Sequence, residues 1–340
     1  MSTHTAVNLP SVALAVTVRN EARLMRAHLE YHHFLGVSRA YVYLDDDQET
    51  AATIADLEYV EMRECVAPER FAGRGGLRHF VEHWHSHLSA RQALNVMDAM
   101  ARAEAHGCDW LLAVDADEIV CLDRRTAGAG SLPIRLAQLP EHVDVASFPN
   151  LEVIQMPRTS GLVFRDARLF RSASAPRRDV TDPRSGAVLT RAACFGHTAG
   201  KCAVRSRRGA VPRGSHGFVS ERGQPLQARN VGELLHYYAY DFDDWLRRSR
   251  NYEGHPHRHV SGAEVEPQKL LWIQLVNESA LELALSRDEL DRYFRETIAF
   301  SPEEIAIHRR RSWRHPLRPP IVEIPAVADA FSTQARLRDY

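Results

Sequence analysis

Apolar residues form short runs and periodic stretches along the first 120 residues, and each of them predicts one element. Val12 to Val18 is a run of strand length, typical of a strand that is covered on both faces in a parallel sheet. After Glu21, apolar and aromatic residues recur at helical spacing up to Gly36, which predicts an amphipathic helix. The same reasoning predicts a short helix near residue 50, a helix over 89–106, and strands over 39–44, 59–63 and 110–114.

This alternation predicts an α/β fold with an open, mostly parallel sheet flanked by helices. In such sheets, ligands bind in the crevice outside the carboxyl ends of the strands. The acidic segments Asp45-Asp46-Asp47 and Asp115-Ala116-Asp117-Glu118 each follow a predicted strand directly. We therefore expect both of them at the ligand-binding edge of the sheet.

The pattern changes after residue 146. Arg-, Gly- and Pro-rich sequence over 172–222 is typical of long loops around an active site. Helical periodicity returns over 231–252, 269–285 and 287–299, and Ser301 with Pro302 and Glu304 predicts the start of one more helix. We therefore expect a ligand-binding α/β domain at 10–235 and a helical C-terminal region at 236–340.

Composition limits the classes of function. With 44% hydrophobic and 26% charged residues, the 340-residue chain can bury a sizeable core. A net charge of -1 gives no general attraction to nucleic acid, so we expect no nucleic-acid partner. The five cysteines are an odd number without a CxxC pair, which argues against a disulfide framework and against a cysteine zinc site.

The expected location follows from the same sequence. The first residues lack the pattern of a classical export signal, and no apolar run is long enough to span a bilayer. We expect a cytoplasmic protein without a transmembrane segment, with a peripheral place at the inner membrane face as the alternative.

Asp115 and Asp117 are the first candidates for metal ligands. Carboxylates at i and i+2 just beyond a buried strand can converge on one Mg²⁺ or Mn²⁺, a cation that typically uses one or two protein carboxylates together with substrate phosphates. Such a cation would neutralise the charge that builds up on a departing diphosphate. The alternative is a strand-to-loop turn without a metal, because Asp is a frequent turn residue.

Several ordered motifs within the first 120 residues resemble one family of enzymes. They are Val18-Arg19-Asn20-Glu21-Ala22, Leu29-Glu30-Tyr31-His32, Leu35-Gly36-Val37, Tyr41-Val42-Tyr43, Asp45-Asp46, and the segment 109–118. This order of motifs resembles the opening of the glycosyltransferase family 2-like and family 92-like proteins, whereas later parts match poorly. The resemblance implies a GT-A-like fold and a metal-dependent, inverting transfer from a UDP- or GDP-sugar to a glycan, lipid-linked or protein acceptor.

The resemblance also implies site residues. The nucleotide-sugar would be bordered by Asn20, Glu21, Asp45, Arg91, Gln92, Asn95, Asp115 and Lys201. The metal would be held by Asp115, Asp117 and a late histidine, with His216 as first choice and His236 as the alternative. Imidazole is an acceptable ligand for Mn²⁺, though not a preferred one for Mg²⁺. A simpler interpretation is that Asn20 and Glu21 cap the first helix and that 45–47 is a solvated loop.

The catalytic base stays open at this stage. Inversion needs a carboxylate that takes the proton of the acceptor hydroxyl, and the sequence does not choose among Glu152, Asp166, Asp179 and Asp182. Glu152 and Asp182 are kept as the candidates. An arginine-rich run over 205–213 either clamps a diphosphate or an anionic acceptor, or is a solvated loop.

Two further hypotheses belong to other classes of protein. His79, His83 and His87 have the spacing of one helix face, and histidines at i and i+4 are a known zinc geometry, so a metallohydrolase is possible on spacing alone. A non-catalytic nucleotide- or glycan-binding protein that keeps the fold is the third hypothesis.

Overall fold

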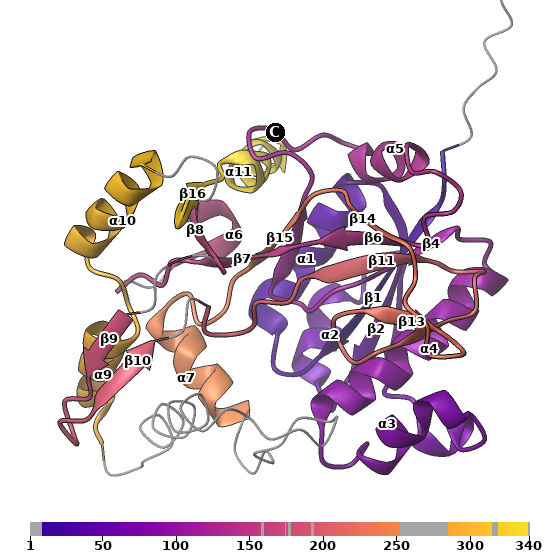
Figure 1. The fold of residues 1–340 in the computed structure, drawn as a ribbon, viewed down its shortest axis with the longest axis horizontal. Coiled ribbons are helices and arrows are strands. Elements are labelled where there is room, and N and C mark those ends of the chain that lie inside the picture. The colour runs from indigo at the N-terminus through magenta and orange to yellow at the C-terminus, as the bar shows by residue number, and fades with distance from the viewer. Residues whose placement is uncertain are drawn as a thin grey trace, which may run out of the picture.

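A computed structural model describes residues 9–157, 160–173, 175, 178–191, 194–251, 285–314 and 319–338 of the chain. Its first half alternates strands and helices as predicted (Figure 1). The elements are β1 (Val12–Val18), α1 (Ala22–Phe34), β2 (Val37–Leu44), α2 (Gln48–Ile54), β3 (Val60–Glu64), α3 (Arg78–Glu82), α4 (Leu88–Ala105) and β4 (Trp110–Ala113), with short 3₁₀ turns at Pro68–Phe71 and Gly75–Leu77.

Seven strands form the first sheet, in the order β14-β6-β11-β4-β1-β2-β3. Strand β1 is an internal strand and pairs in parallel with β2 and β4, as its unbroken apolar run predicts. Strands β6 (Val145–Phe148) and β14 (Ala228–Asn230) pair in parallel at one edge. Strand β11 (Lys201–Arg205) is antiparallel to both of its neighbours. The predicted open, mostly parallel α/β sheet flanked by helices is confirmed.

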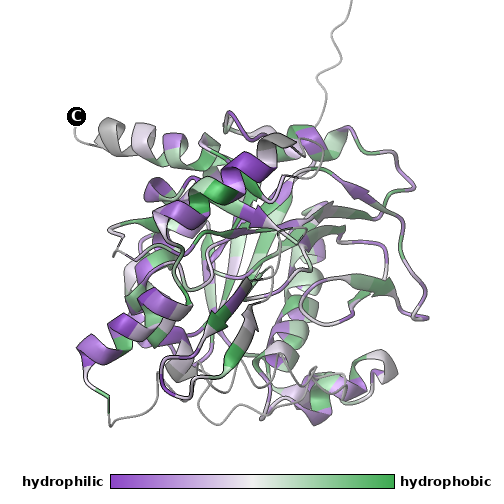
Figure 2. Ribbon diagram, turned by 60° about the vertical axis from the view of Figure 1, so that its left-hand side comes forward, coloured by the Kyte–Doolittle hydropathy of each residue, from purple (hydrophilic) through white to green (hydrophobic). Residues whose placement is uncertain are grey.

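Both faces of this sheet are covered by helices. Leu24 and Leu29 of α1 pack with Leu14 and the other even-numbered residues of β1. Leu94 of α4 packs with Ala15 and the other odd-numbered core residues of β1, on the opposite face. The strands of the sheet are coloured as hydrophobic in Figure 2, whereas the outer faces of the surrounding helices carry the polar residues.

A second, five-stranded sheet has the order β16-β8-β7-β15-β5. Its strands are β5 (Glu118–Cys121), β7 (Asn150–Val153), β8 (Leu169–Ser172), β15 (Glu233–His236) and β16 (Ile321–Glu323). The chain passes from the first sheet into the second at three places: from β4 to β5, from β6 to β7, and from β14 to β15. The acidic segment 115–118 occupies the first of these connections.

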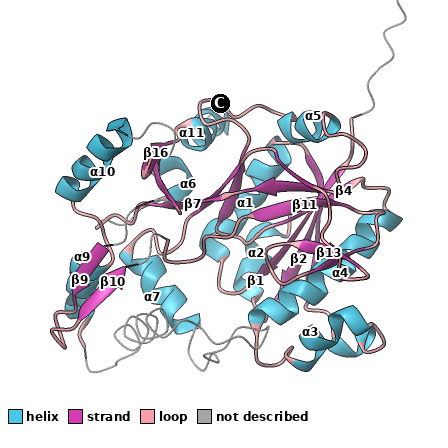
Figure 3. Cartoon of the chain, viewed as in Figure 1, coloured by secondary structure: helices cyan, strands magenta, loops and turns pink. Residues whose placement is uncertain are grey.

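Short elements complete the middle of the chain (Figure 3). The expectation of long loops over 172–222 is wrong in part, because four strand pairings involve this segment. They involve β9 (Arg178–Thr181) with β10 (Val188–Arg191), β11 with β4 and β6, and β12 (Ala210–Pro212) with β13 (Phe218–Ser220). Helix α5 (Ser131–Ala137) lies along the chain between β5 and β6 of the two sheets, and α6 (Val163–Asp166) connects the adjacent strands β7 and β8.

The C-terminal helices agree with the sequence except at one place. The helix predicted over 231–252 is wrong in its first part, because Glu233–His236 forms β15 between β5 and β7. Helix α7 begins only at Phe242 and ends at Asn251. Pairing with two neighbouring strands outweighs the local helical pattern here. The helix predicted over 269–285 lies outside the described residues, apart from Leu285.

Two later helices begin at the predicted caps. Helix α9 (Arg287–Thr297) starts with a capping box between Ser286 and Glu289. Helix α10 (Pro302–Arg314) follows Ser301, whose hydroxyl accepts from the Glu304 amide at 3.3 Å. The last helix is α11 (Ala326–Arg338). Residue 235, where we divide the chain, lies inside β15, and β16 pairs with β8, so both parts share the second sheet. No helix in the described part of the chain is both long and apolar enough to cross a membrane.

Gly36, between α1 and β2, provides a test of the fold. Its φ is +108°, and a Cβ built on it would lie 2.6 Å from Cδ of Pro133 in α5. We expect Gly36→Ala to lower the free energy of unfolding by roughly 2–4 kcal/mol, from backbone strain together with overpacking. Urea unfolding measures this loss. Gly128→Ala is the control, because its Cβ would meet only ordinary contacts, the nearest at 3.6 Å.

Candidate active site

The turn between β4 and β5 places three acidic side chains at the carboxyl end of β4. The turn is closed by two hydrogen bonds: the Asp115 amide donates to the Glu118 carboxylate at 2.7 Å, and the Glu118 amide donates to the Asp115 carbonyl at 3.0 Å. Because β5 belongs to the second sheet, the chain must bend here, and the carboxylates come to lie at the junction of the two sheets. The predicted position of this segment at the ligand-binding edge agrees with the structure.

Asp115 lies between Gln92 of α4 and Lys201 of β11. Gln92 Nε2 donates to one carboxylate oxygen at 2.9 Å, and Lys201 Nζ lies 2.8 Å from the other. Lys201 Nζ is also 3.6 Å from Glu118 Oε2. Burial would lower the pKa of Lys201, but the charges of Asp115 and Glu118 outweigh it and raise that pKa. The lysine is therefore a fixed positive charge.

A pocket opens beside this trio. Its walls come from β1, α4, β4, β11 and the loop between β12 and β13, and they include Thr17, Gln92, Asp115, Lys201, Ser215 and Phe218. One wall is thus polar and charged, and the other is built from small and apolar side chains. This combination is common in small-molecule sites, where a few polar groups orient a ligand against an apolar surface.

Asp117 points toward a different set of partners. Its Oδ2 atom lies 3.0 Å from His236 Nε2 of β15 and 2.7 Å from Arg248 Nη2 of α7. Burial would raise the pKa of Asp117, but Arg248 and His236 outweigh it and hold that pKa well below its ordinary value. Burial would lower the pKa of His236, whereas the Asp117 charge raises it. The aspartate is therefore ionised.

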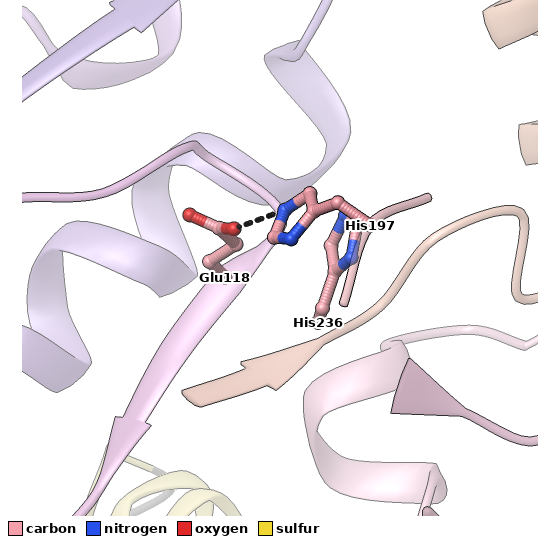
Figure 4. A group of neighbouring side chains, drawn as sticks. All are labelled: Glu118, His197 and His236. Carbon is pink, nitrogen blue, oxygen red and sulfur yellow. Dashed lines mark hydrogen bonds and ion pairs between the residues drawn. The ribbon is translucent and has the colours of Figure 1, made fainter. Parts of the chain in front are cut away.

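Glu118, His197 and His236 form a group that could hold a metal ion (Figure 4). One ligand atom from each lies within 4.8 Å of the others. Glu118 Oε1 is 3.0 Å from His197 Nε2, and the rings of His197 and His236 stack at 4.5 Å. Burial would raise the pKa of Glu118, but Lys201 and His197 lower it to about 2. A carboxylate with two imidazoles is a donor set that suits Mn²⁺ or Zn²⁺ better than Mg²⁺.

His216 lies next to His197, outside the group formed by Glu118, His197 and His236. Its ring centroid is 4.3 Å from that of His197, and its Nδ1 lies 3.3 Å from the Gly200 carbonyl. Burial and the charge of Lys201 lower its pKa to about 3, so the ring is neutral at pH 7. His236 contacts Asp117 directly, whereas the His216 ring contacts His197 and lies outside the group that could hold a metal ion.

The segment that carries His197 is held by Glu152 of β7. The Glu152 carboxylate accepts from the backbone amides of Phe195 and Gly196, both at 2.7 Å, and it is ion-paired with Arg171 of β8. Gly196 is required because a Cβ there would collide with the His236 ring. Two of the hydrogen bonds of Glu152 thus hold the loop that carries His197, and the third joins Glu152 to Arg171.

The first strand-to-helix turn reaches the same region through α7. Asn20 adopts a positive φ of 55°, and Glu21 lies 3.0 Å from Arg247 and 3.6 Å from Arg248. Burial raises the pKa of Glu21 to about 7 against the opposing effect of these two arginines. The two residues predicted near the nucleotide therefore lie next to the Asp117 partners.

Asp45 and Asn95 differ in their surroundings. Asp45 is paired with Arg91 through two contacts of 2.9 and 3.0 Å, so these two predicted residues lie together at the end of β2. Asn95 is fully buried, donates to Thr17 Oγ1 at 3.0 Å and accepts from the Val66 amide at 2.9 Å. Its amide supports the wall of the pocket.

Three predicted carboxylates have local partners away from this cluster. Asp166 accepts from Ser160 beside α6, Asp179 accepts from Thr190 across the β9–β10 hairpin, and Asp182 accepts from Ser185 in the turn of that hairpin. The arginine run over 205–213 begins at the other end of β11. Because β11 is antiparallel to β4, Cys202 faces Ala113 whereas Arg205 faces Trp110, far from the acidic turn.

The prediction that His79, His83 and His87 line one helix face is wrong. Helix α3 ends at Glu82, and His87 precedes the first residue of α4. The three rings still meet edge to face, with centroids 4.7 and 5.2 Å apart. Among the described residues, the three-residue metal-ligating group is the one around Glu118 instead.

Sequence reasoning missed His197, Arg247, Arg248 and the place of Glu118 in the group that could hold a metal ion. His197 lies in a stretch without periodicity, and the arginines lie on a helix remote in sequence from the acidic turn. Glu118 directly follows Asp117 in the acidic segment, and this adjacency was the one available signal.

Comparisons with known proteins found distant relatives. No family model matches the chain. It is similar to two Arabidopsis thaliana proteins named glycosyltransferase-like, with 22% identity over 302 residues and 24% over 241 residues. These matches cover 82% and 64% of this chain but 55% and 51% of the relatives, so the chain spans about half of their length.

Solved structures give weaker likenesses. A CMP:2-keto-3-deoxy-manno-octonic acid synthetase complexed with CTP is 11% identical to this chain, with a TM-score of 0.27. The match covers 58% of this chain and 74% of the synthetase. A 4-diphosphocytidyl-2C-methyl-D-erythritol synthase, also 11% identical, covers 78% of this chain with 98% of its own, at a TM-score of 0.25. The glycosyltransferase-like relatives are thus the comparison that bears on function.

Proposed function

We propose that this protein is a glycosyltransferase that uses a nucleotide-sugar donor and a divalent cation. The observation that carries the proposal is the acidic turn 115–118 at the carboxyl end of β4, beside a pocket and the buried Lys201. In open α/β sheets this edge is where ligands bind. The similarity to two proteins named glycosyltransferase-like supports the same conclusion.

A cation fits the residues that converge here. Asp117, Glu118, His197 and His236 offer two carboxylates and two imidazoles, and His236 Nδ1 is a buried nitrogen without a hydrogen bond. This donor set favours Mn²⁺ over Mg²⁺. When bound, the cation would neutralise charge on the departing nucleoside diphosphate. Asp115, predicted as a direct ligand, is already held by Lys201 and Gln92, and we propose that these three residues face the donor.

The reaction we propose is a direct displacement. The acceptor oxygen forms a bond to the anomeric carbon while the bond from that carbon to the diphosphate oxygen breaks, and a carboxylate takes the acceptor proton. Lys201 adds a fixed positive charge beside the leaving group. The donor would be a UDP- or GDP-sugar, and the acceptor a glycan, a lipid-linked sugar or a protein.

We assign no base among the predicted carboxylates. Glu152 is the nearest of them to the histidines, with Oε2 3.9 Å from His236 Nδ1. Its oxygens are occupied by two backbone amides and Arg171. We propose that Glu152 has a structural role.

Calorimetric titration with UDP and GDP, with and without Mn²⁺, tests the donor site. We expect Mn²⁺-dependent binding of one nucleotide. Asp117→Asn should weaken it by more than roughly tenfold, because the substitution removes a ligand charge while keeping the shape of the side chain. Asp123→Asn is the matched control, since Asp123 lies in the exposed loop after β5 and accepts from the backbone amides of Arg125 and Thr126.

Three outcomes separate the hypotheses. Failure of the folded wild-type protein to bind either nucleotide with Mn²⁺ would refute the donor site. Retention of metal at His79, His83 and His87 in the Asp117→Asn protein would favour the metallohydrolase. Binding without hydrolysis or transfer of any nucleotide-sugar donor would favour the non-catalytic protein.

The role of Glu152 gives a second test. We expect Glu152→Gln to lower the free energy of unfolding by about 3–5 kcal/mol, because a buried guanidinium would lose its counter-charge. Urea unfolding measures the loss, and Asp179→Asn, an exposed carboxylate with one Thr190 partner, is the control. A Glu152→Gln protein with unchanged stability and nucleotide binding, but without turnover, would instead identify Glu152 as the base.

A further inference from the structure

Arg248 on α7 contacts two parts of the candidate site, the β4–β5 turn and the first strand-to-helix turn. Its side chain is 14% exposed, and its Nη2 atom meets Asp117 Oδ2 at 2.7 Å. Neither of these two atoms makes a hydrogen bond of good geometry. The pair is thus held by charge alone, and a buried N–H group keeps its capacity to donate.

Two further contacts anchor the Arg248 side chain. Nε lies 2.9 Å from Asp244 Oδ2, one turn earlier on the same helix, and the guanidinium lies over the Tyr238 ring at 5.2 Å. Nη2 is also 3.6 Å from Glu21. The fork is therefore fixed at its base, while its tip lies between the β4–β5 turn and the first strand-to-helix turn.

Charge balance indicates what this tip is for. A divalent cation on Asp117 would come into contact with a guanidinium that is paired with the same oxygen, and like charges at this separation repel strongly in a buried site. An additional anion between the two cations would relieve this repulsion. A diphosphate supplies such an anion, and a guanidinium fork matches phosphate oxygens.

We propose that Arg248 is a diphosphate-binding residue of the donor site. Before the donor binds, the arginine neutralises Asp117. With donor and cation bound, the Arg248 guanidinium would pair with the diphosphate, and Asp117 would be available as a ligand of the cation. This inference rests on the proposed function, because it assumes a nucleoside diphosphate as the leaving group.

The consequence is a thermodynamic coupling between cation and nucleotide. Each ligand lowers the free-energy cost of binding the other. Thermodynamic linkage requires that the affinity for the cation and the affinity for the nucleotide rise by the same factor. Without Arg248, Asp117 would be open to the cation in the nucleotide-free protein, and the diphosphate would lose one charged partner. A residue with a purely structural role would not change this coupling.

The experiment is a Mn²⁺ titration of the full chain, followed by the paramagnetic signal of free Mn²⁺, with and without the nucleotide that the wild-type protein binds. In Arg248→Gln, Mn²⁺ alone should bind more tightly than in the wild-type protein. Nucleotide affinity at saturating Mn²⁺ should fall by roughly ten- to a hundredfold, as expected for a lost charged hydrogen bond. Arg248→Lys keeps the charge but not the planar fork, so its affinities for Mn²⁺ and for the nucleotide should lie between those of the wild-type protein and those of Arg248→Gln.

Arg287→Gln is the matched control. Arg287 of α9 is ion-paired with Asp243 of α7, so it tests the attachment of the same helix without contact to Asp117. If Arg248→Gln does not fold, Arg248→Lys carries the test alone. Unchanged coupling in a folded Arg248 variant, or equal weakening of Mn²⁺ alone and of nucleotide, would overturn the proposal. Absence of nucleotide binding in the wild-type protein would refute the proposed function instead.

Discussion

Buried negative charge is the constraint on which the second half of this structure depends. Asp117, Glu118 and Glu152 are almost completely buried at the junction of the two sheets. An isolated ion in such a place costs several kcal/mol after relaxation. Each carboxylate is instead met by a cation from a distant element: Arg248 from α7, Lys201 from β11, and Arg171 from β8. The strands and helices that follow residue 146 are thus placed so that they bring these cations together.

The first half of the fold could be predicted because its signals are local. The apolar run at 12–18 and the helical spacing before Gly36 each specify an element without reference to the rest of the chain. Strand β15 is the opposite case. Its four residues, Glu233 to His236, become a strand because β5 and β7 offer hydrogen bonds on both sides. No property of those four residues alone distinguishes them from the start of a helix.

The same contrast between local signals and long-range contacts explains which residues of the candidate site could be predicted from the sequence. Asp115 and Asp117 follow a buried strand, and topology alone puts them at the edge where ligands bind. His236 and Lys201 came from the family resemblance, and the structure brings both into contact with the acidic turn. His197 could not be anticipated, because its position depends on two backbone amides that donate to Glu152 and on the absence of a side chain at Gly196.

The direction of one strand decides which basic residues belong to the site. Strand β11 begins with Lys201 and ends with Arg205, and it pairs with β4 from Cys202 to Arg205. In a parallel pairing, Arg205 would lie near the carboxyl end of β4, beside the acidic turn. Because the pairing is antiparallel, Lys201 lies there instead, and Arg205 stacks on Trp110 at 4.5 Å and donates to the Val143 carbonyl. A compact ammonium can contact both Asp115 and Glu118 from this position, whereas a planar guanidinium would need a wider space.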